Sequence, residues 1–294
     1  MKHPTFPLYT DLCGFNALLP PRAASAPAKG DITADYVVVG AGYTGLAAAR
    51  RLAQLQPQAR IIVIEATEVG EGSSGRNSGF ASPRDLPSGP SAADLRRAEA
   101  LNRFTEEGWA WLMAPIEAHG IDCGLQVSGR IKAAATDLGA KQVRALEAAV
   151  KAAGLPHQLW DRSALQERIG TSYYQCALYT EEGYLLDPAA LIRGLADTLP
   201  ANIALHENTP LLSMQRQGKW HLETPAARRM RCNLASCLFG ACCLRIVWEQ
   251  RCGALGRIGF WCGPCMRMNG RCPPRACGKR CYPVFIGAIQ GLPI

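Results

Sequence analysis

The chain has 294 residues, 48% of them hydrophobic and 19% charged, a composition that indicates a globular protein and excludes a disordered one. No run approaches eighteen apolar residues, so no transmembrane segment is predicted. The formal net charge of +8 arises in residues 227–294, which carry +10 against −2 for the rest. Ten of the 13 cysteines lie in that same segment. The sparse thiols before it favour a reducing compartment and predict a cytoplasmic protein.

Residues 1–34 contain five prolines and no continuous apolar core. This pattern argues against a secretory signal and predicts a flexible N-terminal arm.

Residues 35–65 predict a strand, a helix and a second strand. The β-branched run at 35–39 (DYVVV) suits a buried parallel strand, and the sequence GAGYTG follows it at once. An apolar stripe then predicts a helix over 46–56, and IIVI at 61–64 predicts the next strand, which ends at Glu65.

The glycine spacing in this βαβ unit is typical of a dinucleotide site. Gly40 permits the tight turn, Gly42 lets a pyrophosphate approach the backbone, and Gly45 lets the helix pack close to the strand. The helix N-terminus presents N–H groups and a partial positive charge to the phosphates. Glu65 lies 20 residues after Gly45 and can accept hydrogen bonds from ribose hydroxyls, while it disfavours the 2′-phosphate of NADP.

Residues 70–91 are rich in Gly, Ser and Pro and predict a loop. The elements expected beyond it are helices over 92–119, 138–153 and 188–199 and strands within 126–135, 203–206, 211–215 and 220–224. We expect the large apolar side chains of the first of these helices to pack in the core: Phe104, Trp109, Trp111 and Met113.

Three segments together carry a resemblance to a known family: residues 37–53 (VVVGAGYTGLAAARRLA), 61–66 (IIVIEA) and 69–80 (VGEGSSGRNSGF). The sequence resembles the FAD-dependent oxidoreductases of the D-amino-acid oxidase superfamily, in particular those similar to γ-glutamylputrescine oxidoreductase. The resemblance covers about residues 35–225. It implies an α/β fold, with a Rossmann-like FAD-binding domain in residues 35–90 and about 180–226 and a mixed α+β substrate domain in 91–179, incomplete at the C-terminus.

The resemblance also implies which residues contact FAD: Gly40, Gly42, Tyr43, Thr44, Gly45, Glu65, Ala66, Ser74, Arg76, Asn77, Ser78, Gly79 and Leu211. It implies oxidation of a small-molecule amine or amino acid by hydride transfer to the flavin, with oxygen or a quinone as the electron acceptor. Many substrate-holding residues of the superfamily lie in the C-terminal half, where no match is found here, so no catalytic residue is assigned.

Residues 227–294 depart from this pattern and are rich in Arg, Cys, Gly, Pro and Trp. We expect this tail not to fold natively, and our hypothesis is an out-of-frame translation of GC-rich coding DNA. Residues 261–265 (WCGPC) match the thioredoxin motif without a following helix. Five cysteines of the tail could bind zinc, but they form only one CxxC pair, so no metal site is predicted: Cys262, Cys265, Cys272, Cys277 and Cys281.

Three functions therefore stay open. The leading hypothesis is an FAD-dependent oxidoreductase of amines or amino acids. The second is a non-catalytic FAD-binding remnant. The third is a zinc-binding or nucleic-acid-binding module built on the basic tail, although the tail lacks a recognised nucleic-acid-binding fold, and no nucleic-acid partner is predicted.

Overall fold

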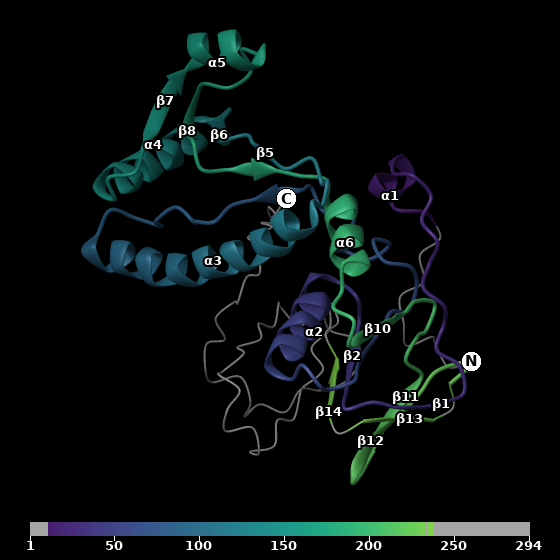
Figure 1. Ribbon diagram of the computed structural model, residues 1–294. Coiled ribbons are helices and arrows are strands. Elements are labelled where there is room, and N and C mark those ends of the chain that lie inside the picture. The colour runs from purple at the N-terminus through teal and green to yellow at the C-terminus, as the bar shows by residue number, and fades with distance from the viewer. Residues whose placement is uncertain (1–10, 228, 233, 238–294) are drawn as a thin grey trace, which may run out of the picture. The chain divides into compact units, whose positions relative to one another are not determined.

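The structure is a computed structural model that describes residues 11–227, 229–232 and 234–237 (Figure 1). This part of the chain forms two compact units, the first made of residues 11–77, 115–123 and 187–237 and the second of residues 78–114 and 124–186. Throughout the described ranges, every helix is too short or too polar to cross a membrane.

The first unit contains three helices and eight strands among its described residues: α1 (Gly14–Leu18), β1 (Asp31–Thr33), β2 (Tyr36–Val39), α2 (Tyr43–Leu55), β3 (Ile61–Ile64), α6 (Pro188–Asp197), β10 (Ile203–His206), β11 (Ser213–Gln217), β12 (Lys219–Glu223), β13 (Arg229–Cys232) and β14 (Leu234–Cys237). The predicted strand–helix–strand unit of residues 35–65 is therefore present as β2, α2 and β3.

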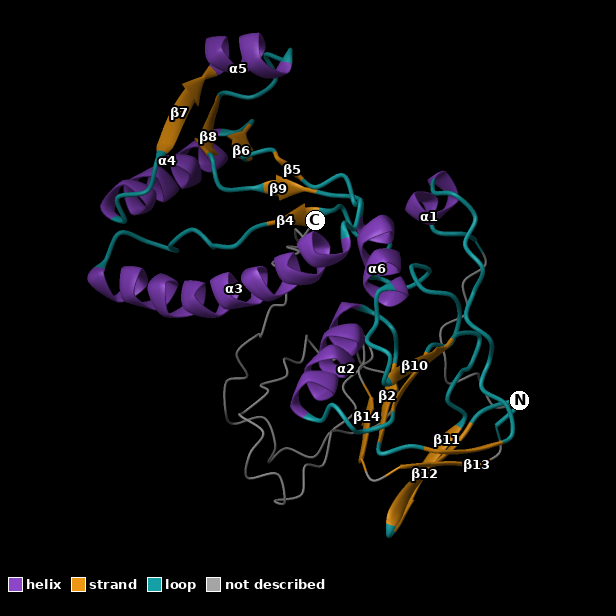
Figure 2. Ribbon diagram, viewed as in Figure 1, coloured by secondary structure: helices purple, strands orange, loops and turns teal. Residues whose placement is uncertain are grey.

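A four-stranded parallel sheet, in the order β10-β3-β2-β14, is the centre of the first unit (Figure 2). All four residues of β3 are buried, as a parallel strand covered on both faces requires. Successive side chains point to opposite faces. One face, with Val38, contacts α2, which in turn contacts α6.

The other face of the parallel sheet packs against a second sheet, in the order β1-β13-β12-β11. Val37, Val39 and Ile64 on the first sheet share one buried apolar cluster with Leu222 of β12 and Met230 of β13. The first unit thus has a layer of helices, a parallel sheet and a mainly antiparallel sheet, and the described chain bears out the α/β fold class.

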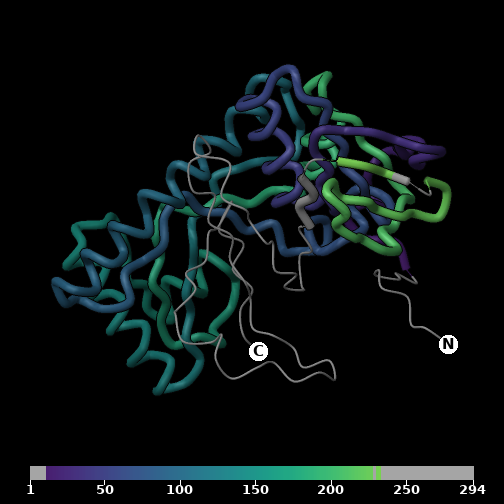
Figure 3. Tube along the Cα trace, turned by 90° about the horizontal axis from the view of Figure 1, so that it is seen from below, coloured from purple at the N-terminus to yellow at the C-terminus, as the bar shows by residue number. Residues whose placement is uncertain are grey.

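Residues 11–34 do not form the flexible arm that the prolines predicted. Cys13, Ala28 and Ala34 are buried, and β1 pairs in parallel with β13, so that residues 31–33 run beside a strand from much later in the sequence (Figure 3). The prolines of this stretch lie after α1, where they permit an extended segment that lies along a surface. The expectation is therefore corrected for residues 11–34, and residues 1–10 lie outside the described part.

The boundary placed at residue 226 also lies too early. Strand β13 pairs with β12 and with β1, and β14 pairs with β2 in a parallel register that joins Leu234 to Tyr36 and Cys237 to Val39. The composition of residues 229–237 concealed two short strands, each of which pairs with a strand from the first 40 residues. The predictions made for the later tail, including the WCGPC motif and the cysteines from Cys262 to Cys281, fall outside the described residues.

The second unit contains two small antiparallel sheets, β6-β8-β7 and β4-β9-β5. Helix α4 covers one face of the first of these sheets, with Val143 and Val150 against Leu178. Its elements are β4 (Phe80–Ala81), most of α3 (Ala92–His119), β5 (Gln126–Val127), β6 (Arg130–Ala134), α4 (Asp137–Ala152), β7 (His157–Asp161), α5 (Arg162–Ile169), β8 (Cys176–Thr180) and β9 (Tyr184–Leu185).

The limits of α3 agree with the sequence, but its expected apolar face is borne out only in part, since Trp109, Trp111 and Met113 are half-buried. Phe104 is 67% exposed, whereas Asn102 and Thr105 are buried. The Asn102 amide exchanges hydrogen bonds with the backbone of Asp85, at 2.8 Å to its N–H and 3.1 Å to its carbonyl. The buried Asn102 is thus paired with the preceding loop, and the Thr105 hydroxyl donates to the Asn102 carbonyl at 3.1 Å. Hydrophobicity alone does not reveal these hydrogen bonds.

The buried sheet of the second unit gives a test of the packing. Leu178 is 1% exposed on the central strand β8, whereas Leu159 on the neighbouring β7 is 38% exposed. We expect Leu178→Ala to lower the free energy of unfolding by about 3 kcal/mol through lost burial and a residual cavity. The matched Leu159→Ala should cost about 1 kcal/mol or less. Urea denaturation measures both, and equal losses would contradict this packing.

Candidate dinucleotide-binding site

The glycine turn, residues 40–45, joins the end of β2 to the start of α2. Gly40 has φ of +102°, a region that side chains disfavour, and its N–H donates to the carbonyl of Ile64 at 2.7 Å. This bond ties the turn to the end of β3. The strand-to-helix junction that the motif requires is therefore present.

Close packing at Gly45 explains why the turn contains glycine there. A Cβ atom at this position would lie 1.8 Å from the carbonyl oxygen of Gly40 and 3.6 Å from Cγ1 of Val38. At Gly42 a Cβ would lie 2.9 Å from the hydroxyl of Ser74. The backbone contact excludes a side chain at Gly45, whereas a side chain at Gly42 would displace the Ser74 hydroxyl from the turn.

The N-terminus of α2 presents backbone donors at this turn. Gly42 is the N-cap and has no side chain to accept them. The Tyr43 N–H donates to the Ser74 hydroxyl at 3.1 Å, while the amides of Thr44 and Gly45 have no acceptor within the helix because they belong to its first turn. Together with the helix dipole, they suit a phosphate group.

The carboxylate of Glu65 lies against the glycine turn. Its Oε2 accepts from the Ala41 N–H at 2.7 Å and its Oε1 from the Thr67 N–H at 3.3 Å. Its backbone carbonyl accepts from the Thr209 N–H at 2.7 Å. Since an ionised carboxylate has about four acceptor positions, two remain for hydroxyl donors. Ala66 follows it and is partly exposed.

The serine–glycine loop, residues 69–77, runs beside the turn. Ser74 touches the turn through the Tyr43 N–H, and the Asn77 side chain donates to the Ser74 carbonyl at 2.7 Å. A Cβ at Gly75 would lie 2.0 Å from the Gly70 carbonyl, so the loop folds tightly on itself. The small residues of this loop thus allow it to fold tightly and to approach the glycine turn.

Tyr43 is the one aromatic residue of the glycine turn. Its hydroxyl donates to the carbonyl of Pro188 at 3.1 Å, at the start of α6. Burial raises the pKa of Tyr43 well above its ordinary value, and the charges of Cys123 and Asp187 act in the same direction, whereas a hydrogen bond with Asn77 opposes them. Tyr43 therefore stays protonated and connects the turn to α6.

The Arg76 side chain forms hydrogen bonds within its own loop and with the N-terminal part of the chain. It donates to the carbonyl of Glu71 at 2.7 Å, to the carbonyl of Asp11 at 2.6 Å and to the Glu71 carboxylate at 3.1 Å. The Arg76 guanidinium therefore forms an ion pair with the Glu71 carboxylate in this structure. Its predicted contact with a cofactor stays a prediction.

The remaining predicted residues lie further along the chain. Ser78 and Gly79 belong to the second unit, where the Gly79 carbonyl accepts from the Leu186 N–H at 3.0 Å. Leu211 is partly buried and packs against the core cluster between the two sheets of the first unit. Any cofactor contact of Leu211 must therefore come from its backbone.

Sequence reasoning missed one prominent residue of this region. Glu207, directly after β10, is fully buried, and its carboxylate accepts from the Val69 N–H at 2.7 Å, at the start of the serine–glycine loop. Its ion-pair partner is Arg22, at 2.8 Å. The available signal was an acid directly after a predicted strand, followed by Asn208, a residue type that tolerates the left-handed conformation it adopts here.

The geometry meets the requirements of a dinucleotide. The cradle has no Cβ atoms at two of its positions, has unused amide donors at a helix N-terminus and has a carboxylate with acceptor capacity at the end of the adjacent strand. Donors for a diphosphate and acceptors for a sugar thus lie next to each other, and both belong to the first unit.

Comparison with known proteins agrees with this geometry. The family profile described as "FAD dependent oxidoreductase" matches residues 35–238. Gamma-glutamylputrescine oxidoreductase of Escherichia coli is 30% identical over 178 residues, which are 58% of this chain and 40% of that protein. A probable oxidoreductase, OrdL of Rhizobium meliloti, is 28% identical over 209 residues, 69% of this chain and 48% of that protein. The chain thus spans about half the length of these curated relatives.

Solved structures show the same fold. Glycine oxidase from Geobacillus kaustophilus superposes with a TM-score of 0.60 and 22% identity, over 71% of this chain and 56% of that one. L-proline dehydrogenase from P. horikoshii gives a TM-score of 0.55 and 18% identity, over 72% of this chain and 54% of that one.

Gly45 gives a direct test of the turn. We expect Gly45→Ala to lower the free energy of unfolding by about 3 kcal/mol, because the new methyl group overlaps the Gly40 carbonyl. Gly14→Ala is the matched control, since a Cβ at Gly14 meets nothing within 4 Å, and its effect should stay within about 0.5 kcal/mol. Urea denaturation measures both, and an unaffected Gly45→Ala would rule out the close packing.

Proposed function

The chain belongs to the FAD-dependent oxidoreductase family, and on that premise we propose that its first unit binds FAD with the diphosphate at the glycine turn. The observation that carries this proposal is the helix N-terminus without Cβ atoms at Gly42 and Gly45, directly beside a strand-end carboxylate. Bound FAD supplies the redox chemistry, since its flavin ring accepts a hydride.

The protein residues then divide into three roles. The amides of Thr44 and Gly45 donate to the diphosphate, and the carboxylate of Glu65 accepts from ribose hydroxyls. Ser74 and Asn77 shape the wall of the site, as their contacts with Tyr43 and with each other support. We assign further contacts to the remaining predicted residues: Gly40, Gly42, Tyr43, Ala66, Arg76, Ser78, Gly79 and the backbone of Leu211.

The proposed reaction is oxidation of a small amine or amino acid. Support comes from the proteins to which the chain is similar, which include γ-glutamylputrescine oxidoreductase and glycine oxidase. We assign the substrate to the second unit, residues 78–114 and 124–186. The acceptor that reoxidises the flavin is oxygen or a quinone, and no side chain is assigned to catalysis.

We further propose a cytoplasmic location. Four cysteines within the described ranges are buried thiols rather than disulfides: Cys13, Cys123, Cys176 and Cys232. Thiols persist where the compartment is reducing, which supports this proposal.

Glu65 tests the cofactor proposal. We expect the purified chain to bind FAD, and Glu65→Gln to raise the dissociation constant about tenfold, because a charged acceptor is lost from the sugar. Glu99→Gln is the control, since Glu99 is exposed and lies on α3 in the second unit. Titration followed by flavin absorbance gives the constants. A wild-type chain that binds no FAD would overturn the proposal.

An anaerobic reduction separates an oxidoreductase from an FAD-binding protein without turnover. We expect addition of small amines or amino acids to the FAD-bound chain to bleach the flavin absorbance, because hydride transfer reduces the ring. Retention of the oxidised spectrum with every substrate, in a chain that dithionite reduces, would favour the non-catalytic alternative.

A further inference from the structure

The N-terminal strap, residues 11–25, is bonded to the serine–glycine loop although more than 40 residues separate the two in the sequence. The carboxylate of Glu71 accepts from the Cys13 N–H and from the Asn16 side chain, each at 2.7 Å. The Cys13 thiol donates to the Gly75 carbonyl at 3.1 Å. Strap donors thus reach both the beginning and the middle of the loop.

A second anchor lies at Glu207. Its buried carboxylate accepts from Arg22 at 2.8 and 2.9 Å, from the Ser25 N–H at 2.6 Å and from the Val69 N–H at 2.7 Å. One carboxylate therefore fixes the end of the strap and the start of the loop to the end of β10. Because each of these bonds involves a charged acceptor, each is stronger than a neutral one.

The surroundings of Arg22 stabilise its positive charge. Burial alone would lower the pKa of Arg22, but hydrogen bonds to Asp197 and Glu207 and the negative charges of both residues raise it above its ordinary value. Asp197 is the outer partner, with about half of its side chain exposed, whereas the Glu207 side chain has no exposure. The inner contact of Arg22 is therefore the one that holds the strap and the loop together.

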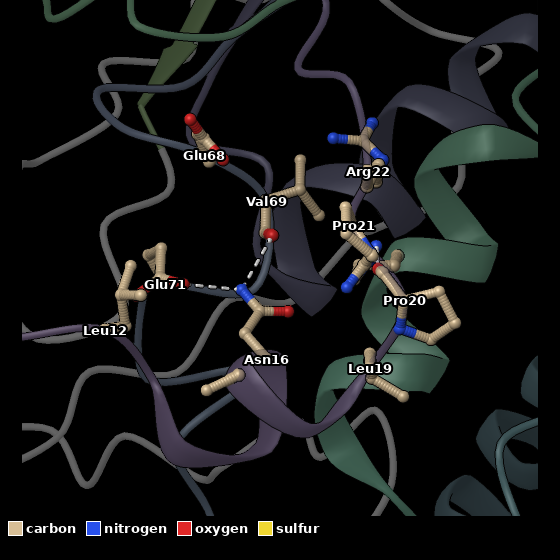
Figure 4. Close-up of a pocket in the computed structure, with 11 residues that line it drawn as sticks. Leu12, Asn16, Leu19, Pro20, Pro21, Arg22, Glu68, Val69 and Glu71 are labelled. Atoms are coloured by element: carbon tan, nitrogen blue, oxygen red, sulfur yellow. Dashed lines mark hydrogen bonds between the residues drawn. The ribbon is translucent and has the colours of Figure 1, made fainter.

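Polar bonds rather than apolar packing join the strap and the loop. Figure 4 shows a pocket between them, with a volume of about 200 Å³. Leu12, Leu19 and Arg22 line it from the strap, and Val69 and Glu71 line it from the loop. Asn16 bridges this space to the Val69 carbonyl and to Glu71. Loss of these bonds removes the side-chain bridge between the strap and the start of the loop, and the contacts of Cys13 and Arg76 remain.

We propose that the N-terminal strap is a positioning device for FAD, in which Asn16 and Arg22 hold the serine–glycine loop in the conformation that presents Ser74 at the glycine turn. This inference rests on the proposed function, since it assumes that the chain binds FAD. Ser74 contacts the first amide of α2, so a displaced loop removes one wall of the site. Neither Asn16 nor Arg22 needs to touch the cofactor for this effect.

Variants of the full-length chain test the strap through FAD affinity and through the FAD-free protein. Asn16→Asp keeps the shape but places a second carboxylate against Glu71. We expect it to raise the FAD dissociation constant about tenfold, because a loop that is correctly placed about a tenth of the time binds proportionally more weakly. Hydrogen–deuterium exchange of amides 69–77 should be faster in the FAD-free variant.

Arg22 gives the second set of variants. Arg22→Ala should weaken FAD binding by about the same factor, and Arg22→Lys should recover part of the loss because it restores the charge beside Glu207. Asp197→Asn is the control and should stay within about twofold of wild type, since the inner contact of Arg22 remains. If Arg22→Ala shows no cooperative thermal transition, the isosteric Asn16→Asp decides the question.

The outcomes separate the two proposals. If wild type binds FAD, and Asn16→Asp binds it within about twofold of wild type, the strap has no role in positioning, even where the melting temperature falls. Unchanged exchange of amides 69–77 in that variant would overturn the inference as well. If wild type binds no FAD, the proposed function itself is wrong and the inference falls with it.

Discussion

The parallel pairing of β2 with β3 is the constraint on which the rest of the site depends. Parallel strands end at the same edge of a sheet, so the glycine turn after Val39 and the carboxylate after Ile64 must meet. The pairing of β10 with β3 brings Glu207 to the same edge. Amide donors and two carboxylates from three separate stretches of chain are therefore brought together before any ligand binds.

The sequence predicted those elements whose signals, such as helix caps and apolar spacing, lie within a few neighbouring residues. The helix α6 is one of these, because Pro188 occupies its first turn and the Asp187 carboxylate accepts from two of its amides. Strands β8 and β13 were missed. Each pairs with a near neighbour in the sequence, β7 and β12 respectively, and with a more distant strand, β6 and β1, so part of its pairing leaves no local signal. Residues 11–34 were misjudged for the same reason: prolines report local backbone freedom, whereas the ordering comes from distant contacts.

The residues of the candidate site also fall into those that the sequence predicted and those that it did not. Gly42, Gly45 and Glu65 could be read from spacing, because each requirement is set by the backbone near that residue. Arg22 and Glu207 could not, because an ion pair between positions 185 residues apart leaves no periodic signal. Arg76 illustrates the opposite difficulty, since its residue type suited a phosphate while the structure pairs it with Glu71.

The full burial of Glu207 restricts how this chain can change by substitution. A buried ion pair can often be replaced by two apolar residues at little cost, but this carboxylate also accepts from the amides of Ser25 and Val69. An apolar pair would leave both backbone donors without an acceptor in the interior. Position 207 is consequently confined to side chains that accept several hydrogen bonds, and position 22 to partners compatible with them, so the two must vary together.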